Sequence, residues 1–490
     1  MRKVTMTQQS TASDVLSIVI AGASGDLARK KIYPALFSLY CQGYLPERFH
    51  IFGFARSKFD DAEFRRRITE HLTCRYAPGE SCGQRMTEFL ERCHYASGDY
   101  GCHDAMLDLY TLMRDVEGGL PADRLFYIAT PPFVFLDVVR AIGDAGLVSC
   151  GSERPWSRVV VEKPFGHDRE SSDELIRAMA HVFVEHQIYR IDHYLGKEVI
   201  QNLLVLRFAN LVFEPIWNAN FIRSVAIDWK EDLRVEGRGG YFDQYGIIRD
   251  VVQNHLLQIL SLVAMEPPRQ LCPVEIAHEK VRVLRGIPPL KLEDLVIGQY
   301  GEAVRNGKRF PAYVDEDGIA ADSITPTYAA ARMWVDNPRW NGVPFFLTAG
   351  KGLDTKETEI RIRFRDVEPN MFCQRHICPD PNELVIRVQP DESIYLSVVN
   401  KVPGVGMTLR SQNLDLQYKM AFPEQIPDAY ESLLLDVMEG DRSLFIQSGE
   451  VRAAWDILTP VLHELERRGV VPERYEFGSA GPAAAQSLLP

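Results

Sequence analysis

Apolar and polar positions alternate in two different ways along this chain, and the change comes near residue 190. Before that point, longer helical stretches separate short apolar runs at 16–21, 51–54, 125–129 and 159–161. Short apolar runs bounded by turns are typical of buried strands. The pattern predicts a parallel sheet with helices between its strands. Ligands bind at the carboxyl ends of such strands, so the residues that follow each run are the first candidates for a site.

The remainder of the chain is richer in strand-like alternation. In 359–365, three arginines alternate with two isoleucines and a phenylalanine, and a second strand-like run follows at 382–390. A period of two predicts half-buried strands, the first with a basic exposed face. A solvated face explains these arginines at least as well as a ligand site does.

Length and charge restrict the class of protein. A chain of 490 residues exceeds the size at which one core stops growing, so two domains are expected. The net charge of -12 argues against a nucleic-acid or anionic-membrane partner, since both require a basic face. No apolar run approaches the ~20 residues of a membrane span. We therefore expect a cytoplasmic protein that holds anionic ligands with local groups of lysine and arginine.

The nine cysteines are odd in number and scattered, which predicts free thiols in a reducing compartment. Cysteine and histidine also lie close together around residues 93–103 and 373–378. Neither group has the paired spacing of zinc modules, so no metal site is predicted.

A glycine turn follows the first apolar run. Gly22 suits a tight turn, Gly25 lets the backbone approach a pyrophosphate, and Ala28 allows close packing of helix on strand. The order of strand, glycine turn and helix is the opening of a dinucleotide-binding unit, although a merely tight turn would have the same order. Arg56 follows the next strand, where NAD-binding units usually carry an acid. It indicates the 2'-phosphate of NADP, unless it is an ordinary surface cation.

Two further segments carry candidate chemistry. Lys163 follows the run at 159–161 and could reach both a cofactor and a substrate. In the string 190–198, RIDHYLGKE, His193 and Lys197 are four residues apart and could bind one phosphate together. A solvated polar turn is the alternative. His255 lies in the apolar helical run 247–260, where a lone histidine is usually a core residue.

The string 190–198 resembles the substrate-site motif of the glucose-6-phosphate dehydrogenase family, and the resemblance extends from about Val15 to about Pro482. It implies an α/β plus α+β fold, in which a Rossmann-like domain precedes a larger domain with a mainly antiparallel sheet covered by helices. The expected boundaries are a flexible arm at 1–14, an NADP-binding domain at 15–191, a substrate-binding and oligomerisation domain at 192–482 and a tail at 483–490.

The resemblance also implies a reaction, the oxidation of β-D-glucose 6-phosphate at C1 to the 6-phospho-1,5-lactone with NADP as cofactor. It implies catalytic roles for His255 as base, Asp192 as its partner and Lys163. Substrate-binding roles fall on Lys163, His193, Tyr194, Lys197, Glu231, Asp250, Lys351, Lys356 and Gln389. Cofactor-binding roles fall on Gly22, Ala23, Ser24, Gly25, Asp26, Leu27, Arg56 and Lys163. The expected assembly is a homodimer or homotetramer.

One departure from the family pattern adds a prediction. Animal members bind a second, structural NADP through basic side chains of the sheet domain. This chain has Thr348, Glu357, Ser397 and Ala480 at the matching positions. Arg361 and Arg387 remain, so we expect one NADP per subunit. The alternatives to the family activity are another NADP-dependent sugar dehydrogenase and a non-catalytic NADP-binding sensor.

Overall fold

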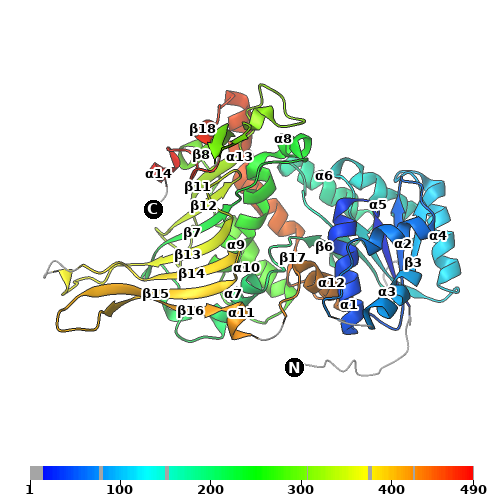
Figure 1. The fold of residues 1–490 in the computed structure, drawn as a ribbon, viewed down its shortest axis with the longest axis horizontal. Coiled ribbons are helices and arrows are strands. Elements are labelled where there is room, and N and C mark those ends of the chain that lie inside the picture. Colours follow the sequence, from blue (N-terminus) through cyan, green and yellow to red (C-terminus); the bar gives the residue numbers. More distant parts are fainter. Residues whose placement is uncertain are drawn as a thin grey trace. The chain divides into compact units, whose positions relative to one another are not determined.

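The computed structural model describes residues 15–76, 81–148, 154–305, 307–373, 378–422 and 425–488 (Figure 1). The arm expected at 1–14 lies outside the described residues. The chain divides into two compact units that are not continuous in sequence. The first comprises 1–165, 173–193 and 427–447, and the second 166–172, 194–426 and 448–490.

The first unit is built on a seven-stranded sheet in the order β17-β6-β5-β4-β1-β2-β3. Its strands are β1 (Val15–Ala21), β2 (Arg48–Ala55), β3 (Cys93–Ser97), β4 (Ala122–Ile128), β5 (Ser157–Val161), β6 (Ile188–Ile191) and β17 (Phe445–Ile446). All neighbours pair in parallel except β17, which runs antiparallel to β6. Every residue of β1 is buried, as expected of a strand covered on both faces.

Helices cover both faces of this sheet. They are η1 (Ala28–Ile32), α1 (Tyr33–Gln42), α2 (Asp61–Thr69), α3 (Ser81–Glu91), α4 (His103–Val116), η2 (Pro132–Val134), α5 (Phe135–Asp144), α6 (Arg169–Ala180), η3 (Glu185–Gln187) and α12 (Ala429–Glu439). Side chains of α1, α2, α3 and α12 join one apolar cluster with β1 and β2. Helix α12 comes from far along the chain, yet Tyr430, Leu433 and Leu434 are buried in this cluster.

The second unit is built on a nine-stranded sheet in the order β16-β15-β14-β13-β7-β12-β11-β8-β18. Its strands are β7 (Ile222–Lys230), β8 (Leu295–Gly301), β11 (Tyr328–Trp334), β12 (Pro344–Gly350), β13 (Glu357–Phe364), β14 (Glu383–Gln389), β15 (Ser393–Lys401), β16 (Leu409–Gln417) and β18 (Glu473–Glu476). Only β7 with β12 and β8 with β18 pair in parallel, so the sheet is mainly antiparallel, as predicted. A small hairpin, β9 (Ala303–Arg305) and β10 (Lys308–Phe310), stands apart from it.

Helices α7, α9 and α10 lie along this second sheet in Figure 1. The helices of the unit are α7 (Glu198–Phe208), η4 (Glu214–Ile216), α8 (Gly239–Ile247), η5 (Ile248–Leu256), α9 (Leu257–Ala264), α10 (Pro273–Arg285), η6 (Leu292–Asp294), η7 (Tyr313–Asp315), α11 (Tyr418–Ala421), α13 (Ser448–Arg468) and α14 (Ala485–Leu488). Element η5 is a π-helix, wider than an α-helix, and it continues directly into α9. No helix of the described ranges is long and apolar enough to cross a membrane.

The prediction of free thiols was wrong for four cysteines. Cys74 is paired with Cys82, and Cys373 with Cys378, with Cα–Cα distances of 5.8 and 4.3 Å. Each pair closes a short loop, and the spacing of two cysteines in the sequence does not reveal whether their thiols face each other in the fold. Cys41, Cys93, Cys102 and Cys272 are free.

Candidate active site

The carboxyl end of β1 carries the glycine turn. Gly22 has a φ of +90°, and a Cβ there would lie 2.4 Å from the carbonyl oxygen of Ala129 after β4. The peptide nitrogen of Gly22 donates to Phe54 O on β2 at 2.9 Å. Only glycine therefore allows β1, β2 and β4 to approach one another at this point. Ala28 is fully buried, as expected for close helix packing.

The turn carries charge as well as glycine. Asp26 accepts hydrogen bonds from Arg29 at 2.7 Å and from Lys30 at 2.8 Å. The bond from Lys30, followed by that from Arg29, lowers the pKa of Asp26 to about 2. Ser24 and Leu27 lie in the same turn, and the Ser24 hydroxyl is 3.4 Å from that of Ser57 after β2. The turn thus places two cations, Arg29 and Lys30, around one ionised acid.

Arg56 is exposed at the carboxyl end of β2. Its guanidinium lies 5.9 Å from the ring centre of Tyr100. Within the described ranges, no carboxylate forms an ion pair with Arg56. Its positive charge is therefore available to an anionic ligand at the strand ends.

A buried network lies at the ends of β4 and β5. Glu162 accepts hydrogen bonds from Tyr127 at 2.5 Å and from Tyr430 at 3.3 Å. Burial raises the pKa of Glu162. Tyr430 also stacks on His193, with ring centres 6.5 Å apart and planes 7° apart. Lys163 is half-buried and directly follows Glu162, so a catalytic candidate and a phosphate-binding candidate adjoin one polar network.

The string 190–198 crosses between the two units. Asp192 is buried just after β6, and His193 ends this segment of the first unit. Tyr194 begins a segment of the second unit. The string therefore supplies side chains to both units.

In the second unit, three predicted substrate residues come together. Gln389 donates from Nε2 to Tyr194 Oη at 3.2 Å and to Thr358 Oγ1 at 3.0 Å. The ammonium of Lys197 donates to Gln389 Oε1 at 3.4 Å and lies 5.2 Å from the Tyr194 ring centre. Gln389 is held in place because it pairs with Thr358 across β13 and β14. Tyr194 is buried.

His255 joins the same group from the π-helix η5. Its side chain is 2% exposed, and its ring centre is 4.6 Å from that of Tyr194. Gly246, with φ +64° and ψ 173°, interrupts α8 one residue before its end, just before this segment begins. A π-helix places side chains at spacings that an α-helix does not offer and is frequent at functional sites. Asp250 lies on the same helix and is half-buried.

The end of the second sheet brings further candidates together. Lys230 at the end of β7 pairs with Gly350 of β12 and with Glu357 of β13. Glu231, Lys351 and Lys356 neighbour these three residues in sequence, so they lie at the same end of the sheet. Lys351 Nζ donates to Glu231 Oε2 at 2.6 Å and lies 5.2 Å from the Trp229 ring centre. Lys356 is exposed just before β13, and no bond joins it to the other candidates within the described ranges.

Some residues of these groups were not singled out by sequence. Trp229 donates through Nε1 to Tyr194 Oη, and its ring faces Lys351, so it connects two groups of candidates. Its place near the end of β7, two residues before Glu231, was a usable signal, because residues at a strand end lie close to one another. Tyr430 and Tyr127 offered none, because only the fold brings them to Glu162.

The arginines of the second sheet are already paired with acids. Arg361 bonds Glu359 at 3.0 Å and Glu383 at 2.8 Å, and Arg387 bonds Glu359 at 2.6 Å. Glu357 is half-buried, and burial followed by the charge of Glu359 raises its pKa. The positive charges of Arg361 and Arg387 are therefore compensated by acids on the same sheet.

Two family models match the chain. The model of the glucose-6-phosphate dehydrogenase NAD-binding domain matches residues 19–202, and that of the glucose-6-phosphate dehydrogenase C-terminal domain matches 204–490. Together they cover nearly all of the sequence.

Individual proteins match over comparable lengths. Glucose-6-phosphate 1-dehydrogenase 1, chloroplastic, of Arabidopsis thaliana is 52% identical over 96% of this chain and 82% of its own length. Glucose-6-phosphate 1-dehydrogenase of Dictyostelium discoideum is 47% identical over 99% of this chain and 95% of its own. A solved structure of glucose-6-phosphate dehydrogenase in complex with glucose-6-phosphate has a TM-score of 0.89 and 40% identity, covering 98% of this chain and 97% of the other.

The expectation of a cytoplasmic location is contradicted by these relatives. The proteins at 51–52% identity from Arabidopsis thaliana, Nicotiana tabacum, Solanum tuberosum and Spinacia oleracea are all named chloroplastic. Composition and charge could not have revealed this, because the folded enzymes of plastid and cytoplasm meet similar solvent conditions.

Proposed function

The chain belongs to the glucose-6-phosphate dehydrogenase family, and we propose that the groups at its two sets of strand ends carry out the reaction of that family. The enzyme oxidises β-D-glucose 6-phosphate at C1 to 6-phospho-D-glucono-1,5-lactone, with NADP as the cofactor. This is the first step of the oxidative pentose phosphate pathway. NADP, when bound, accepts the hydride from C1.

The proposed cofactor site is the turn at the end of β1. Gly22, Ala23, Ser24, Gly25, Asp26 and Leu27 form the turn, and Arg56 and Lys163 lie at neighbouring strand ends. A glycine turn at a strand end lets a pyrophosphate approach the backbone closely, and the guanidinium of Arg56, which has no acid partner in the described ranges, suits the 2'-phosphate. These observations support NADP over NAD.

His255 is proposed as the general base that takes the proton of the C1 hydroxyl. Histidine has a suitable pKa range for this, and its buried position on η5 restricts the ring. Asp192 is proposed to orient the imidazole and stabilise its charge. The support is chain continuity, because Asp192 is two residues before Tyr194, a span of at most about 7 Å, and Tyr194 packs on His255.

The sugar phosphate is assigned to the groups around Tyr194. His193, Tyr194 and Lys197 are proposed to bind the phosphate, because imidazole, phenol and ammonium groups all donate to anionic oxygens. Glu231 and Asp250 are proposed to accept from sugar hydroxyls, and Lys163 to donate to both ligands. Lys351, Lys356 and Gln389 complete the substrate contacts. A sugar without the phosphate would lack the charged oxygens that these donors bind, which gives specificity.

The convergence of His255, Tyr194, Lys197 and Gln389 carries this assignment. His255→Asn should lower kcat about 10²-fold to 10⁴-fold with little change in KM, because the loss of a base acts on the transition state. The readout is the NADPH absorbance produced from glucose 6-phosphate. The exposed residue His103 provides the matched control, His103→Asn, which should keep normal turnover. A normal kcat in His255→Asn would remove the base assignment.

The same absorbance assay on the native enzyme separates the family reaction from the two alternatives. Production of NADPH from glucose but not from glucose 6-phosphate would indicate another sugar dehydrogenase. NADP binding without turnover of either sugar would indicate a sensor. One relative, from Arabidopsis thaliana at 44% identity, is named inactive, which makes the direct assay the appropriate test.

Lys197 tests the phosphate assignment separately. Lys197→Ala should raise KM for glucose 6-phosphate far more than KM for glucose, because only the former carries the charge that Lys197 binds. Equal losses on both sugars would place Lys197 elsewhere.

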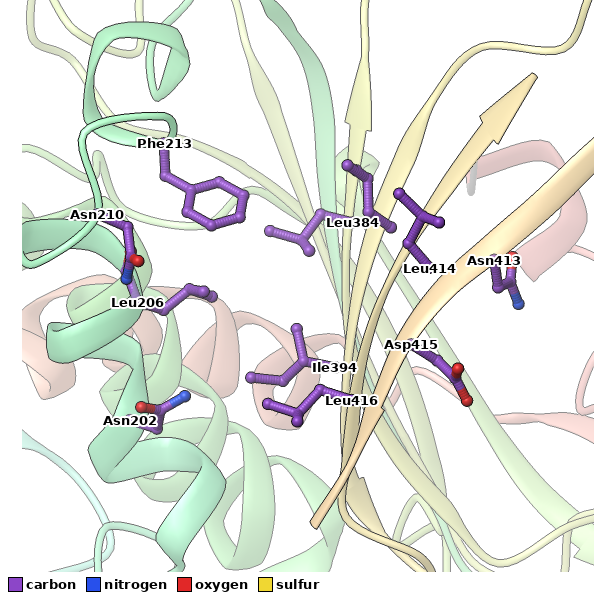
Figure 2. A pocket seen from close by; sticks show the side chains of 11 residues that line it. Asn202, Leu206, Asn210, Phe213, Leu384, Ile394, Asn413, Leu414, Asp415 and Leu416 are labelled. Atoms are coloured by element: carbon purple, nitrogen blue, oxygen red, sulfur yellow. The ribbon is translucent and has the colours of Figure 1, made fainter. Parts of the chain in front are cut away.

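A homo-oligomer is proposed through the free edge of the second sheet. Edge strand β16 is exposed along most of its nine residues, and Leu414 and Leu416 are 63% and 39% exposed. Beside it lies a pocket of about 660 Å³ between α7 and strands β14 to β16. Figure 2 shows Leu206 and Phe213 on one side of this pocket and Leu384 and Ile394 on the other.

An exposed edge with apolar side chains readily pairs with another chain, and a second copy supplies the same edge. Leu414→Glu should shift the mass in light scattering toward the monomer. Val184→Glu, at a residue 52% exposed in the first unit, should not. An unchanged mass in both variants would exclude this edge as the contact.

A further inference from the structure

The loop that follows Lys163 belongs to the second unit, although Lys163 itself belongs to the first. Residues 166–172 group with the second unit, between 1–165 and 173–193 of the first. Lys163 is three residues before Gly166, a span of at most about 11 Å. The contacts that hold residues 166–172 in the second unit therefore also restrict the position of Lys163.

The loop has a defined shape. Gly166 has a φ of +86°, and a Cβ there would meet the Ser172 backbone nitrogen at 2.6 Å. Asp168 accepts from Ser171 N at 2.8 Å and from its hydroxyl at 2.7 Å, which caps the start of α6. The Ser171 hydroxyl accepts in turn from His167 N at 3.0 Å. The loop, which consists of residues 166–168 and the first turn of α6, is thus held in a defined conformation by its own hydrogen bonds.

Helix α13 presents one polar face to this loop. Asp456, Thr459, His463 and Glu466 recur at the spacing of a single helical face. Arg169 N donates to Thr459 Oγ1 at 3.0 Å, and the Arg169 guanidinium pairs with Asp456. His463 Nε2 lies 3.6 Å from Asp168 Oδ2. Helix α13 therefore holds the loop from one side.

The base helix contacts the loop through Arg249. Arg249 Nε donates to the carbonyl oxygen of His167 at 2.8 Å, and Nη2 pairs with Glu466 at 2.5 Å. Arg249 is 15% exposed, and it lies on η5 next to Asp250 and six residues before His255. One side chain thus connects the helix of the base to the loop that continues from Lys163.

We infer that Arg249 is a positioning residue, which sets the Lys163 ammonium relative to the His255 helix by fixing the His167 carbonyl. The inference rests on the proposed roles of Lys163 and His255. A displacement of about 1 Å in a positioning group can cost about 100-fold in rate. The ionic partner Glu466 is 60% exposed, and exposed ion pairs add little to stability. The hydrogen bond to the carbonyl is therefore expected to act on turnover more than on folding.

The first test compares two variants of the same contact. Arg249→Gln should lower kcat about 10-fold to 100-fold, with KM for glucose 6-phosphate within about 3-fold and Tm nearly unchanged. Glu466→Gln removes only the exposed ion pair and should keep kcat within about 2-fold. Arg309→Gln, which breaks the exposed pair with Glu302, is the control for the loss of a charge. Normal turnover in Arg249→Gln, or equal losses in Arg249→Gln and Glu466→Gln, would overturn the inference.

The second test asks whether Arg249 acts through Lys163. In enzyme that already carries Lys163→Met, Arg249→Gln should cause almost no further loss, because the group it positions is gone. Losses that multiply would show that Arg249 acts by another route and would overturn the inference. If Lys163→Met alone had normal turnover, the role of Lys163 in the proposed function would fail and this inference with it. Loss in Lys163→Met but not in Arg249→Gln would remove the inference alone.

Discussion

Arginines lie on both sheets, but in two different electrostatic settings. Arg56 follows β2 of the first sheet and faces the ring of Tyr100, with no acid partner in the described ranges. Arg361 and Arg387 of the second sheet share Glu359, and Arg361 also bonds Glu383. The hydrogen bond to Glu359 raises the pKa of Arg387. The first cation is thus available to a ligand, and the other two already have their counter-ions.

This difference shows that a basic residue indicates an anion site only when its own neighbours leave it unpaired. Alternation along β13 predicted a basic face but could not show which acids lie across the strands. Register supplies them, because Glu359 pairs with Arg387 and Arg363 with Glu383. Cross-strand pairs of opposite charge are an ordinary way to stabilise a sheet.

The largest expected effect is at Arg56. Arg56→Asp should weaken NADP binding about 100-fold, because it removes a cation and adds repulsion near the 2'-phosphate, while NAD binding should change much less. The measurement is kcat/KM with each cofactor. Arg48→Asp, at the opposite end of β2, is the matched control and should leave the preference intact. An unchanged ratio of NADP to NAD in Arg56→Asp would show that another group discriminates between them.

A smaller effect is expected at Glu359. Its side chain is only 3% exposed and is shared by two arginines. Glu359→Gln should lower the free energy of unfolding by about 1.5–3 kcal/mol, the range for hydrogen bonds to charged groups. Urea denaturation measures this. Glu302→Gln, which breaks the exposed pair with Arg309, should change stability by at most about 0.5 kcal/mol. Equal effects in both variants would mean that the acids of the second sheet contribute no more than surface pairs.

The smallest expected effect is that of excess NADP on the native enzyme. One NADP should bind per subunit, and Tm should stop rising once that site is saturated, because Arg361 and Arg387 are already neutralised. Calorimetric titration gives the stoichiometry. Two equivalents per subunit, or a dinucleotide found near Arg361 and Arg387, would refute the prediction and show that paired arginines can still exchange partners.

Local patterns were sufficient for much of the fold. Buried apolar runs predicted β1, β2, β4 and β5, and Gly22 marked the turn between β1 and the following helix. Alternation predicted β13 and β14, and the mainly antiparallel sheet implied by the family resemblance is confirmed. These features depend on neighbours in sequence, whose side-chain spacing is fixed by the type of element.

Contacts between distant segments were not predictable in the same way. Tyr430 reaches Glu162 and His193 only because 427–447 packs on the first unit. The ring of Trp229 meets Lys351 because β7 pairs with β12. The residue assignments at the string 190–198 came from a family resemblance, and they stay predictions until variants are assayed. Lys356, assigned in the same way, is exposed, and among the described residues no bond joins it to the other candidates.

The return of 427–447 to the first unit has a consequence for synthesis on the ribosome. Tyr430, Leu433, Leu434, Val437 and Phe445 belong to the apolar cluster of a unit whose other segments end at His193. More than 200 residues separate the two, so at typical elongation rates the nascent unit waits on the order of ten to fifty seconds for its last helix. During that interval the apolar surface that α12 will cover is open. The growing chain should therefore depend on chaperones well before its second domain is complete.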